Sequence, residues 1–235
     1  MTPTWKPAAE SLVADLRNVF GDRLRAVVAY GPILDGAKDA PLTCLALVAS
    51  LTAEDLQACS QLAGRWERAH IATPLVLPEQ EFMRSLDTFP LEYGEIIRAH
   101  ERVYGADPFT TATIARDDLR RACELQAQSH LLHLREAFIE SGGSPTAVAR
   151  LVTSSAPSFT ALLRNVARLH GVSTGDRAEV TRAGAQAAGM PEGLVTDMLN
   201  LERQGGVQAV DVSRSFPEYL ASVERLARVI DSWRT

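Results

Sequence analysis

The chain has 235 residues, of which 46% are hydrophobic and 23% are charged, and its formal net charge at pH 7 is −5. This length is enough for one large domain or two small ones, each with a hydrophobic core that needs no disulfide or metal cross-link. Three Cys without a Cys-x-x-Cys pair exclude a disulfide framework and a Cys-based zinc site.

The distribution of charged and apolar residues excludes two kinds of partner. Residues 1–110 carry 10 basic and 15 acidic residues, and residues 111–235 carry 14 of each. Neither half is basic, so we expect no double-stranded DNA partner. No apolar run approaches the roughly 18 residues of a membrane span, and the first residues lack the order of a signal peptide. We therefore expect a cytoplasmic protein that does not bind a membrane.

The first half alternates the patterns of helices and strands. Apolar residues at helical spacing predict one helix, and continuous apolar runs predict three strands. These elements span residues 8–20, 24–30, 42–49 and 71–77. Thr52 and Asp55 are typical of the start of a second helix, which is expected to reach residue 70. Pro74 favours an edge position for the third strand, and residues 91–104 are interpreted as a strand followed by a turn.

Everything after Asp107-Pro108 has a helical pattern. Six helices separated by short segments rich in Gly, Ser and Pro are typical of a bundle. They are expected at residues 117–140, 144–153, 158–170, 176–188, 191–204 and 215–233. The predicted fold is thus an α/β (α+β) domain with a small mixed sheet at residues 1–108, followed by an all-α bundle at residues 109–235.

Several segments resemble the nucleotidyltransferase superfamily, which has the polymerase-β-like fold. Val27–Gly31 matches that family's first strand and glycine, and Leu45–Val48 matches the apolar strand that follows its carboxylates. Residues 89–93 and 103–108 are similar to bacterial members, as is a helical C-terminal domain. The resemblance implies a nucleotidyltransferase-like domain that would use Mg²⁺ and a nucleotide.

The residues that would carry this chemistry are missing. On the alignment that ends at Leu45, the two carboxylate positions hold Leu42 and Cys44, and the Ser after the glycine is Pro32, which has no backbone N–H. The stretch 71–77, where a third carboxylate is expected, contains no Asp or Glu. The resemblance therefore favours a degenerate member without metal or cofactor, a pseudoenzyme rather than an enzyme.

The preferred hypothesis is a non-enzymatic ligand-binding or protein-interaction module. Its cleft, between the sheet and the helical bundle, is expected at Tyr30, Gly31, Pro32, Leu42 and Cys44. These residues make the cleft less charged than that of an active relative. It should hold a neutral or apolar small molecule, or a protein partner should bind the surface.

Two enzymatic alternatives stay open. The first is a divergent Mg²⁺-dependent nucleotidyltransferase that uses Asp35, Asp39 or Glu92. The second is a ribonuclease, because Arg164 and His170 resemble the Arg-Asn…His signature of HEPN ribonucleases, where His would act as acid or base.

The long helix at residues 117–140 carries two further features. It is a candidate homodimer interface, although periodicity does not separate an interface stripe from a core stripe. His130, His133 and Glu136 follow one another at three-residue steps. Their spacing is not that of a helical zinc motif, so a polar helix face is the favoured interpretation.

Overall fold

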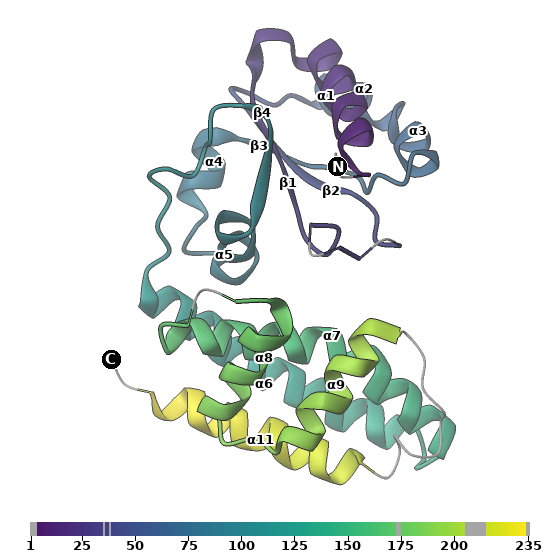
Figure 1. The fold of residues 1–235 in the computed structure, drawn as a ribbon, viewed down its shortest axis with the longest axis vertical. Helices are drawn as coiled ribbons and strands as arrows, with labels where there is room; N and C mark the ends of the chain where they lie inside the picture. Colours follow the sequence, from purple (N-terminus) through teal and green to yellow (C-terminus); the bar gives the residue numbers. More distant parts are fainter. Residues whose placement is uncertain (1–3, 35, 38, 173–174, 205–214, 234–235) are drawn as a thin grey trace. The chain divides into compact units, whose positions relative to one another are not determined.

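The chain folds into two compact units. The computed structural model describes residues 4–34, 36–37, 39–172, 175–204 and 215–233. Contacts divide the chain into Met1–Ile114, here called the sheet unit, and Ala115–Thr235, here called the helical unit (Figure 1).

The sheet unit combines one small sheet with short helices. In chain order its elements are α1 (Lys6–Phe20), the 3-10 turn η1 (Gly21–Arg23), β1 (Leu24–Tyr30), β2 (Thr43–Val48), α2 (Ala53–Ser60), α3 (Ala63–Arg68), β3 (Leu75–Pro78), α4 (Glu79–Arg84), α5 (Pro90–Arg98) and β4 (His100–Gly105). The strand order is β3-β2-β1-β4. β1 is antiparallel to β2 and β4, and β2 is parallel to β3, so the sheet is mixed, as the sequence predicts.

Both faces of the central strands are buried, which explains why their sequences are almost entirely apolar. Alternate residues point to opposite faces. One core cluster joins Val27 and Ala29 of β1 to α1, α2 and α3, and the other joins Ala26 and Val28 to α4 and α5. A strand buried on both sides has no position for an unpaired charge.

Two carboxylates anchor helices on the first of these faces. Asp55 forms a capping box with Thr52 at the start of α2, as the sequence predicts, and accepts hydrogen bonds at 2.6 and 2.7 Å from the Arg23 guanidinium. The hydrogen bonds from Arg23 lower the pKa of Asp55 to about 2. Asp15 of α1 is buried and accepts a 3.0 Å bond from Trp66 Nε1 of α3.

The sequence interpretation of residues 91–104 is wrong. Pro90 occupies the first turn of helix α5, whose apolar side is buried, and the strand β4 comes after it. β4 lies at the sheet edge and is half exposed, so it lacks the apolar run of a central strand. The predicted third strand does lie at the other edge, as β3.

The sheet unit extends beyond the predicted boundary at residue 108. Phe109 is buried against Phe82 and Tyr93, and Ala112 and Ile114 pack on the same cluster. These contacts attach residues 109–114 to the sheet.

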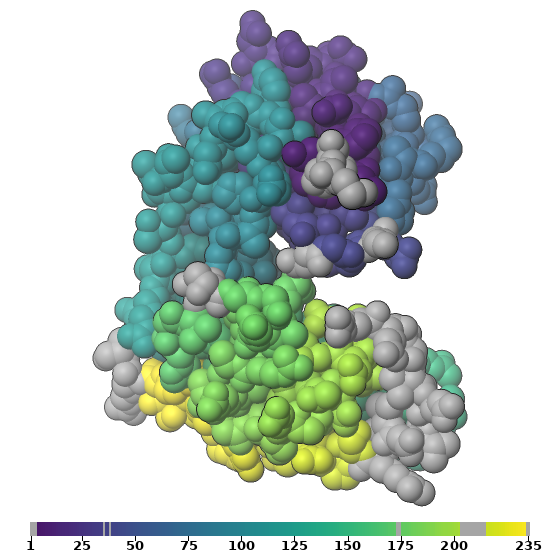
Figure 2. All heavy atoms as spheres, in the orientation of Figure 1, coloured from purple at the N-terminus to yellow at the C-terminus, as the bar shows by residue number. Residues whose placement is uncertain are grey.

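The helical unit is a bundle around one central helix, α7 (Pro145–Leu169), which contacts each of the other described helices of the unit. Its elements are α6 (Arg116–Glu140), α7 (Pro145–Leu169), α8 (Arg177–Ala187), α9 (Glu192–Gln204) and α11 (Phe216–Ser232). In Figure 2 the green and yellow-green atoms of α8 and α9 form much of the visible face of this unit, and yellow atoms of α11 lie along its lower edge. Within the described ranges, no helix combines the length and apolar character needed to cross a membrane.

One continuous helix, α7, replaces the two helices predicted at residues 144–153 and 158–170. Pro157 lies inside it. An interior Pro costs a helix about 3 kcal/mol. Thirteen residues of α7 are buried, and each large apolar side chain contributes about 1.5–3 kcal/mol on burial. Packing therefore outweighs the local break that Ser-Ser-Ala-Pro-Ser suggests.

A chain of hydrogen bonds joins α6, α7 and α11. His130 Nε2 lies 2.8 Å from the Tyr219 hydroxyl, which lies 3.0 Å from Ser155 Oγ. Ser155 Oγ in turn donates to the carbonyl of Val152 at 3.0 Å. A neutral His130 that donates to Tyr219 is consistent with this order, because each hydroxyl then donates to the next group. Of the three polar residues that the sequence places at three-residue steps on α6, His130 thus turns toward α7 and α11, whereas His133 and Glu136 are exposed and contact each other.

The first stability prediction concerns Gly184 of α8. A Cβ at this position would lie 1.8 Å from the Leu163 carbonyl oxygen of α7, so Gly184→Ala should separate two helices that pack closely. We expect a loss of about 2–4 kcal/mol of unfolding free energy in the helical unit, measured by urea denaturation. Gly193→Ala is the matched control, because its Cβ would meet no atom within 4 Å. It should be neutral or stabilising by about 0.5–1 kcal/mol.

The second prediction concerns pH. Burial, and to a lesser degree the charge of His133, lower the pKa of His130 to about 4, against 6.5 for the free side chain. The unfolded chain therefore binds a proton between pH 6.5 and 4 that the folded chain does not. The contribution of neutral His130 to the free energy of unfolding should be complete above pH 6.5 and should be lost as the pH falls toward 4. The total loss should be on the order of 3 kcal/mol.

His130→Gln, which does not titrate, should flatten this part of the stability curve. His133→Gln is the control and should retain most of the slope, because burial is the larger cause of the lowered pKa of His130. A slope that survives in His130→Gln would assign the titration to another group.

Candidate functional site

The turn after β1 is where the sequence places the cleft. Tyr30 pairs with Thr43 at the ends of β1 and β2, and the Thr43 hydroxyl donates to the Tyr30 carbonyl. Gly31 has φ +85°, and a Cβ there would lie 2.8 Å from Thr43 Oγ1, so the turn requires glycine. Tyr30 and Gly31 are half-buried and Pro32 is exposed.

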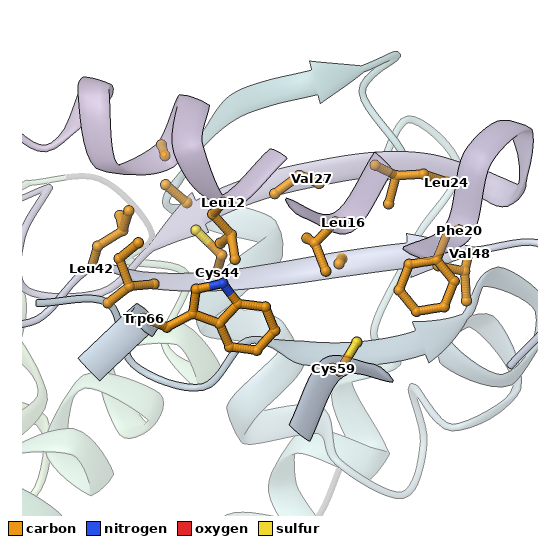
Figure 3. Close-up of a cluster of buried hydrophobic side chains, with 14 of the residues drawn as sticks. Leu12, Leu16, Phe20, Leu24, Val27, Leu42, Cys44, Val48, Cys59 and Trp66 are labelled. Atoms are coloured by element: carbon orange, nitrogen blue, oxygen red, sulfur yellow. The ribbon is translucent and has the colours of Figure 1, made fainter. Parts of the chain in front are cut away.

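Leu42 and Cys44, by contrast, belong to the hydrophobic core. Their exposed fractions are 2% and 1%. Figure 3 shows them in the cluster that includes Leu12 of α1 and Trp66 of α3. Burial raises the pKa of the Cys44 thiol to about 12, so it is protonated at neutral pH. Cys59 and Cys123 are buried as well.

These residues do not fit Mg²⁺. The ion takes oxygen ligands and is usually held by one or two carboxylates together with phosphate oxygens, and neither a leucine side chain nor a protonated thiol supplies one. Ile71, at the start of the stretch expected to hold a third carboxylate, is buried and bridges to Leu42. We therefore derive no metal-dependent step at this position.

The loop after Gly31 uses its own backbone donors. The N–H groups of Leu34, Gly36 and Ala37 donate to the carbonyls of Gly31, Ile33 and Pro32 at 3.0, 3.3 and 3.1 Å. Phosphate-binding loops instead direct such N–H groups toward the anion. The described part of this loop is thus not arranged as a phosphate cradle.

The carboxylates of the first enzymatic alternative do not form a cluster in the described structure. Asp35 lies outside the described residues. Asp39 is exposed, and its carbonyl contacts His70 Nε2 at 3.2 Å. Glu92 is exposed on α5. Within the described ranges, no group of three or more His, Cys, Asp or Glu residues could hold a metal ion.

The two residues of the ribonuclease alternative occupy different environments. Arg164 is buried, with its Nη1 3.5 Å from Thr181 Oγ1 and 3.6 Å from Glu202 Oε1. His170, exposed at the C-terminal end of α7, packs edge-on against Trp233 with ring centroids 4.4 Å apart. Residues six positions apart on a helix point about 120° apart. Arg164 therefore links α7 to α8 and α9 and is not presented to a substrate together with His170.

A cavity of about 450 Å³ lies within the sheet unit, beside the N-terminus of α1; we call it the α1 pocket. Its walls come from the start of α1, the loop after β1 and the start of β4. The lining residues are Thr4, Trp5, Ile33, Leu34, Gly36, Ala37, Ala99, His100 and Glu101. None of these described lining residues is Lys or Arg.

Glu101 connects the α1 pocket to the face that carries Cys44. Ala29 of β1 pairs with Cys44 on one side and with Glu101 on the other, and directly paired residues share a face of the sheet. Cys44, Ala29 and Glu101 thus form a row across the sheet. Cys44 and Ala29 are apolar and buried, and the row ends in the exposed carboxylate of Glu101 on the edge strand. Among the described residues, the Glu101 side chain has no hydrogen-bond or ion-pair partner.

The neighbouring residue, His100, has one ring nitrogen committed to the backbone. Its Nδ1 lies 3.1 Å from the carbonyls of both Ile96 and Ile97, so Nδ1 carries a hydrogen. Nε2 lies 3.6 Å from Asp107 Oδ1. Sequence reasoning missed His100 and Glu101 because it interpreted residues 91–104 as a strand followed by a turn, with the strand first. Their polar character within a strand was the available signal for an edge position.

The chain is similar to the crystal structure of spectinomycin adenyltransferase AAD(9) from Enterococcus faecialis with ATP and spectinomycin. The TM-score is 0.60 and the sequence identity 12%, and the match covers 96% of this chain and 99% of that chain. The chain has a nucleotidyltransferase-like fold. No protein-family model and no curated protein sequence matches it. At this identity the likeness establishes the fold, and the activity has to be argued from the residues.

The burial of Cys44 generates a prediction. Cys44→Asp would place a carboxylate in the core of this nucleotidyltransferase-like domain without a counter-ion. We expect it to lower the unfolding free energy at pH 7 by about 3–5 kcal/mol, as measured by urea denaturation. Cys44→Ser, a neutral polar control of similar size, should cost about 1–3 kcal/mol. The combined Leu42→Asp and Cys44→Asp variant should not regain stability in Mg²⁺, and restoration by Mg²⁺ would reveal a latent metal site.

Proposed function

We propose that this chain is a nucleotidyltransferase-like protein without metal-dependent catalysis, and that it binds a small molecule in the α1 pocket. The observation that carries the proposal is the burial of Leu42 and Cys44 at the two positions where the resemblance implies metal-binding carboxylates. The fold is retained around them, while the chemistry that Mg²⁺ requires is replaced by core packing.

The character of the α1 pocket supports a neutral or apolar ligand. Trp5, Ile33 and Leu34 provide apolar surface, and a volume of about 450 Å³ lies in the range of small-molecule sites. Glu101 would accept a hydrogen bond from a donor group of the ligand and would repel phosphate. ATP and spectinomycin are bound to AAD(9). For this chain, two features argue against a triphosphate in the α1 pocket. The Glu101 carboxylate is exposed there, and the backbone N–H groups of the loop after Gly31 donate to carbonyls of the same loop.

The first test is the thermal melting midpoint with ATP, CTP, GTP and UTP, each with and without Mg²⁺. A ligand at 100 times its dissociation constant stabilises a protein by about 2.7 kcal/mol, which is a shift of several degrees for a chain of this size. We expect no Mg²⁺-dependent shift. Such a shift would overturn the proposal and direct mutagenesis to Asp35, Asp39 and Glu92.

The second test locates ligand binding by NMR with a library of neutral and apolar compounds. Ala37→Trp should fill part of the α1 pocket and abolish binding, because Ala37 is an exposed lining residue. Ala53→Trp is the control, since Ala53 is exposed at the start of α2 and does not line the pocket. Binding that persists in Ala37→Trp would place the ligand elsewhere.

A further inference from the structure

The two ends of α1 border different cavities. Beside the C-terminal end lies a cavity of about 300 Å³, which we call the Tyr104 pocket. It belongs to the sheet unit, where the last turns of α1 and the turn η1 approach the end of β4. The lining residues are Ala14, Arg17, Asn18, Gly21, Asp22 and Tyr104. None of them lines the α1 pocket, so the two cavities are separate.

The Tyr104 pocket carries both signs of charge. Arg17 supplies a positive charge, Asp22 supplies a negative one, and Asn18 adds an amide that can donate and accept hydrogen bonds. In the part of the chain that the structure describes, these three side chains have no hydrogen-bond or ion-pair partner. They are exposed, so their polar groups can be reached from solvent.

Arg17 is held in place although it forms no ion pair. Its guanidinium carbon lies 5.8 Å from the centroid of the Tyr104 ring, which is a cation–π arrangement. It also lies in the last turn of α1, where the helix dipole favours a cation. A side chain that is fixed in advance loses less entropy on binding. Arg17 is therefore prepared to bind a carboxylate, whose two oxygens match the donors of a guanidinium.

Asp22 has the opposite relation to the helix. It directly follows Gly21, the C-cap of α1, at the end where the helix carbonyls carry partial negative charge. A carboxylate is disfavoured at this end of a helix. The turn η1, whose first turn also contains Asp22, has only three residues, so α1 has the larger dipole. An ammonium group beside Asp22 would be attracted both by the carboxylate and by the end of α1.

We propose that the Tyr104 pocket binds a small zwitterion, a free α-amino acid. The carboxylate of the amino acid contacts the Arg17 guanidinium, and its ammonium group contacts the Asp22 carboxylate. The two lining charges cancel, so a ligand with a single charge would face a like charge on one side. A zwitterion satisfies both groups at once.

The size of the pocket restricts the amino acid. A volume of about 300 Å³ is at the small end of small-molecule sites, which favours glycine, alanine or serine over amino acids with large side chains. Because the charged groups are exposed, each ion pair contributes little, and we expect dissociation constants of about 0.1–1 mM. This inference is independent of the function proposed for the α1 pocket.

The test is an NMR titration of the full chain with glycine, L-alanine and L-serine up to about 10 mM. We expect saturable shifts of the backbone amide signals of Ala14, Gly21 and Tyr104, while the signal of Ala37 in the α1 pocket stays unchanged. N-acetylalanine lacks the ammonium group and alaninamide lacks the carboxylate, so each should bind about 10-fold more weakly than alanine, or weaker still. No saturable shift with any of the three amino acids, or equal binding of the blocked forms, would overturn the proposal.

Two variants test the roles of the charged side chains. Arg17→Gln and Asp22→Asn should each weaken alanine binding by about 10-fold, and neither should prevent folding, because both side chains are exposed. Arg68→Gln is the matched control, since Arg68 is also exposed in the last turn of a helix, α3, and lines neither cavity. Alanine binding that is unchanged in both pocket variants would place the amino acid elsewhere and contradict the inference.

Discussion

The packing of α1 and Trp66 against one face of β1 and β2 is the contact around which the sheet unit is built. That contact buries Leu42 and Cys44, and it is held in register by the bond from Trp66 to Asp15. An unpaired carboxylate in such a core costs several kcal/mol, which is comparable to the whole stability margin of many domains. The sheet therefore cannot hold both a closed apolar core and a carboxylate Mg²⁺ site at the positions of Leu42 and Cys44.

The edge of the same face has the opposite character. The row from Cys44 through Ala29 reaches solvent at Glu101, on a strand with no neighbour beyond it in the described sheet. An exposed carboxylate is stable there because water solvates it. The α1 pocket lies where this edge strand and the loop after Gly31 meet the start of α1.

The parts of the structure that the sequence predicts are those governed by local rules. The apolar runs of β1 and β2 and the capping box at Thr52 identify their elements directly. Two elements are determined by tertiary context instead. The polar sequence of β4 suits only an edge strand, and in α7 the free energy of burial outweighs the cost of Pro157 within the helix. The same distinction holds for the candidate site. That the positions implied by the resemblance hold Leu42 and Cys44 instead of carboxylates can be recognised from the sequence. The α1 pocket cannot, because it is formed by three segments far apart in sequence and no local pattern marks it.

In the helical unit, the rotation of α6 about its axis is fixed by a polar contact. His130 must face Tyr219 and Ser155 for all three groups to be hydrogen-bonded, and buried polar networks are costly when only partly satisfied. Leu132 lies two residues further on and so points about 200° away. A rotation that buried Leu132 would withdraw His130 from Tyr219 and leave its hydroxyl with one bond fewer. The hydrogen bonds of His130 therefore keep Leu132 on the exposed side of α6.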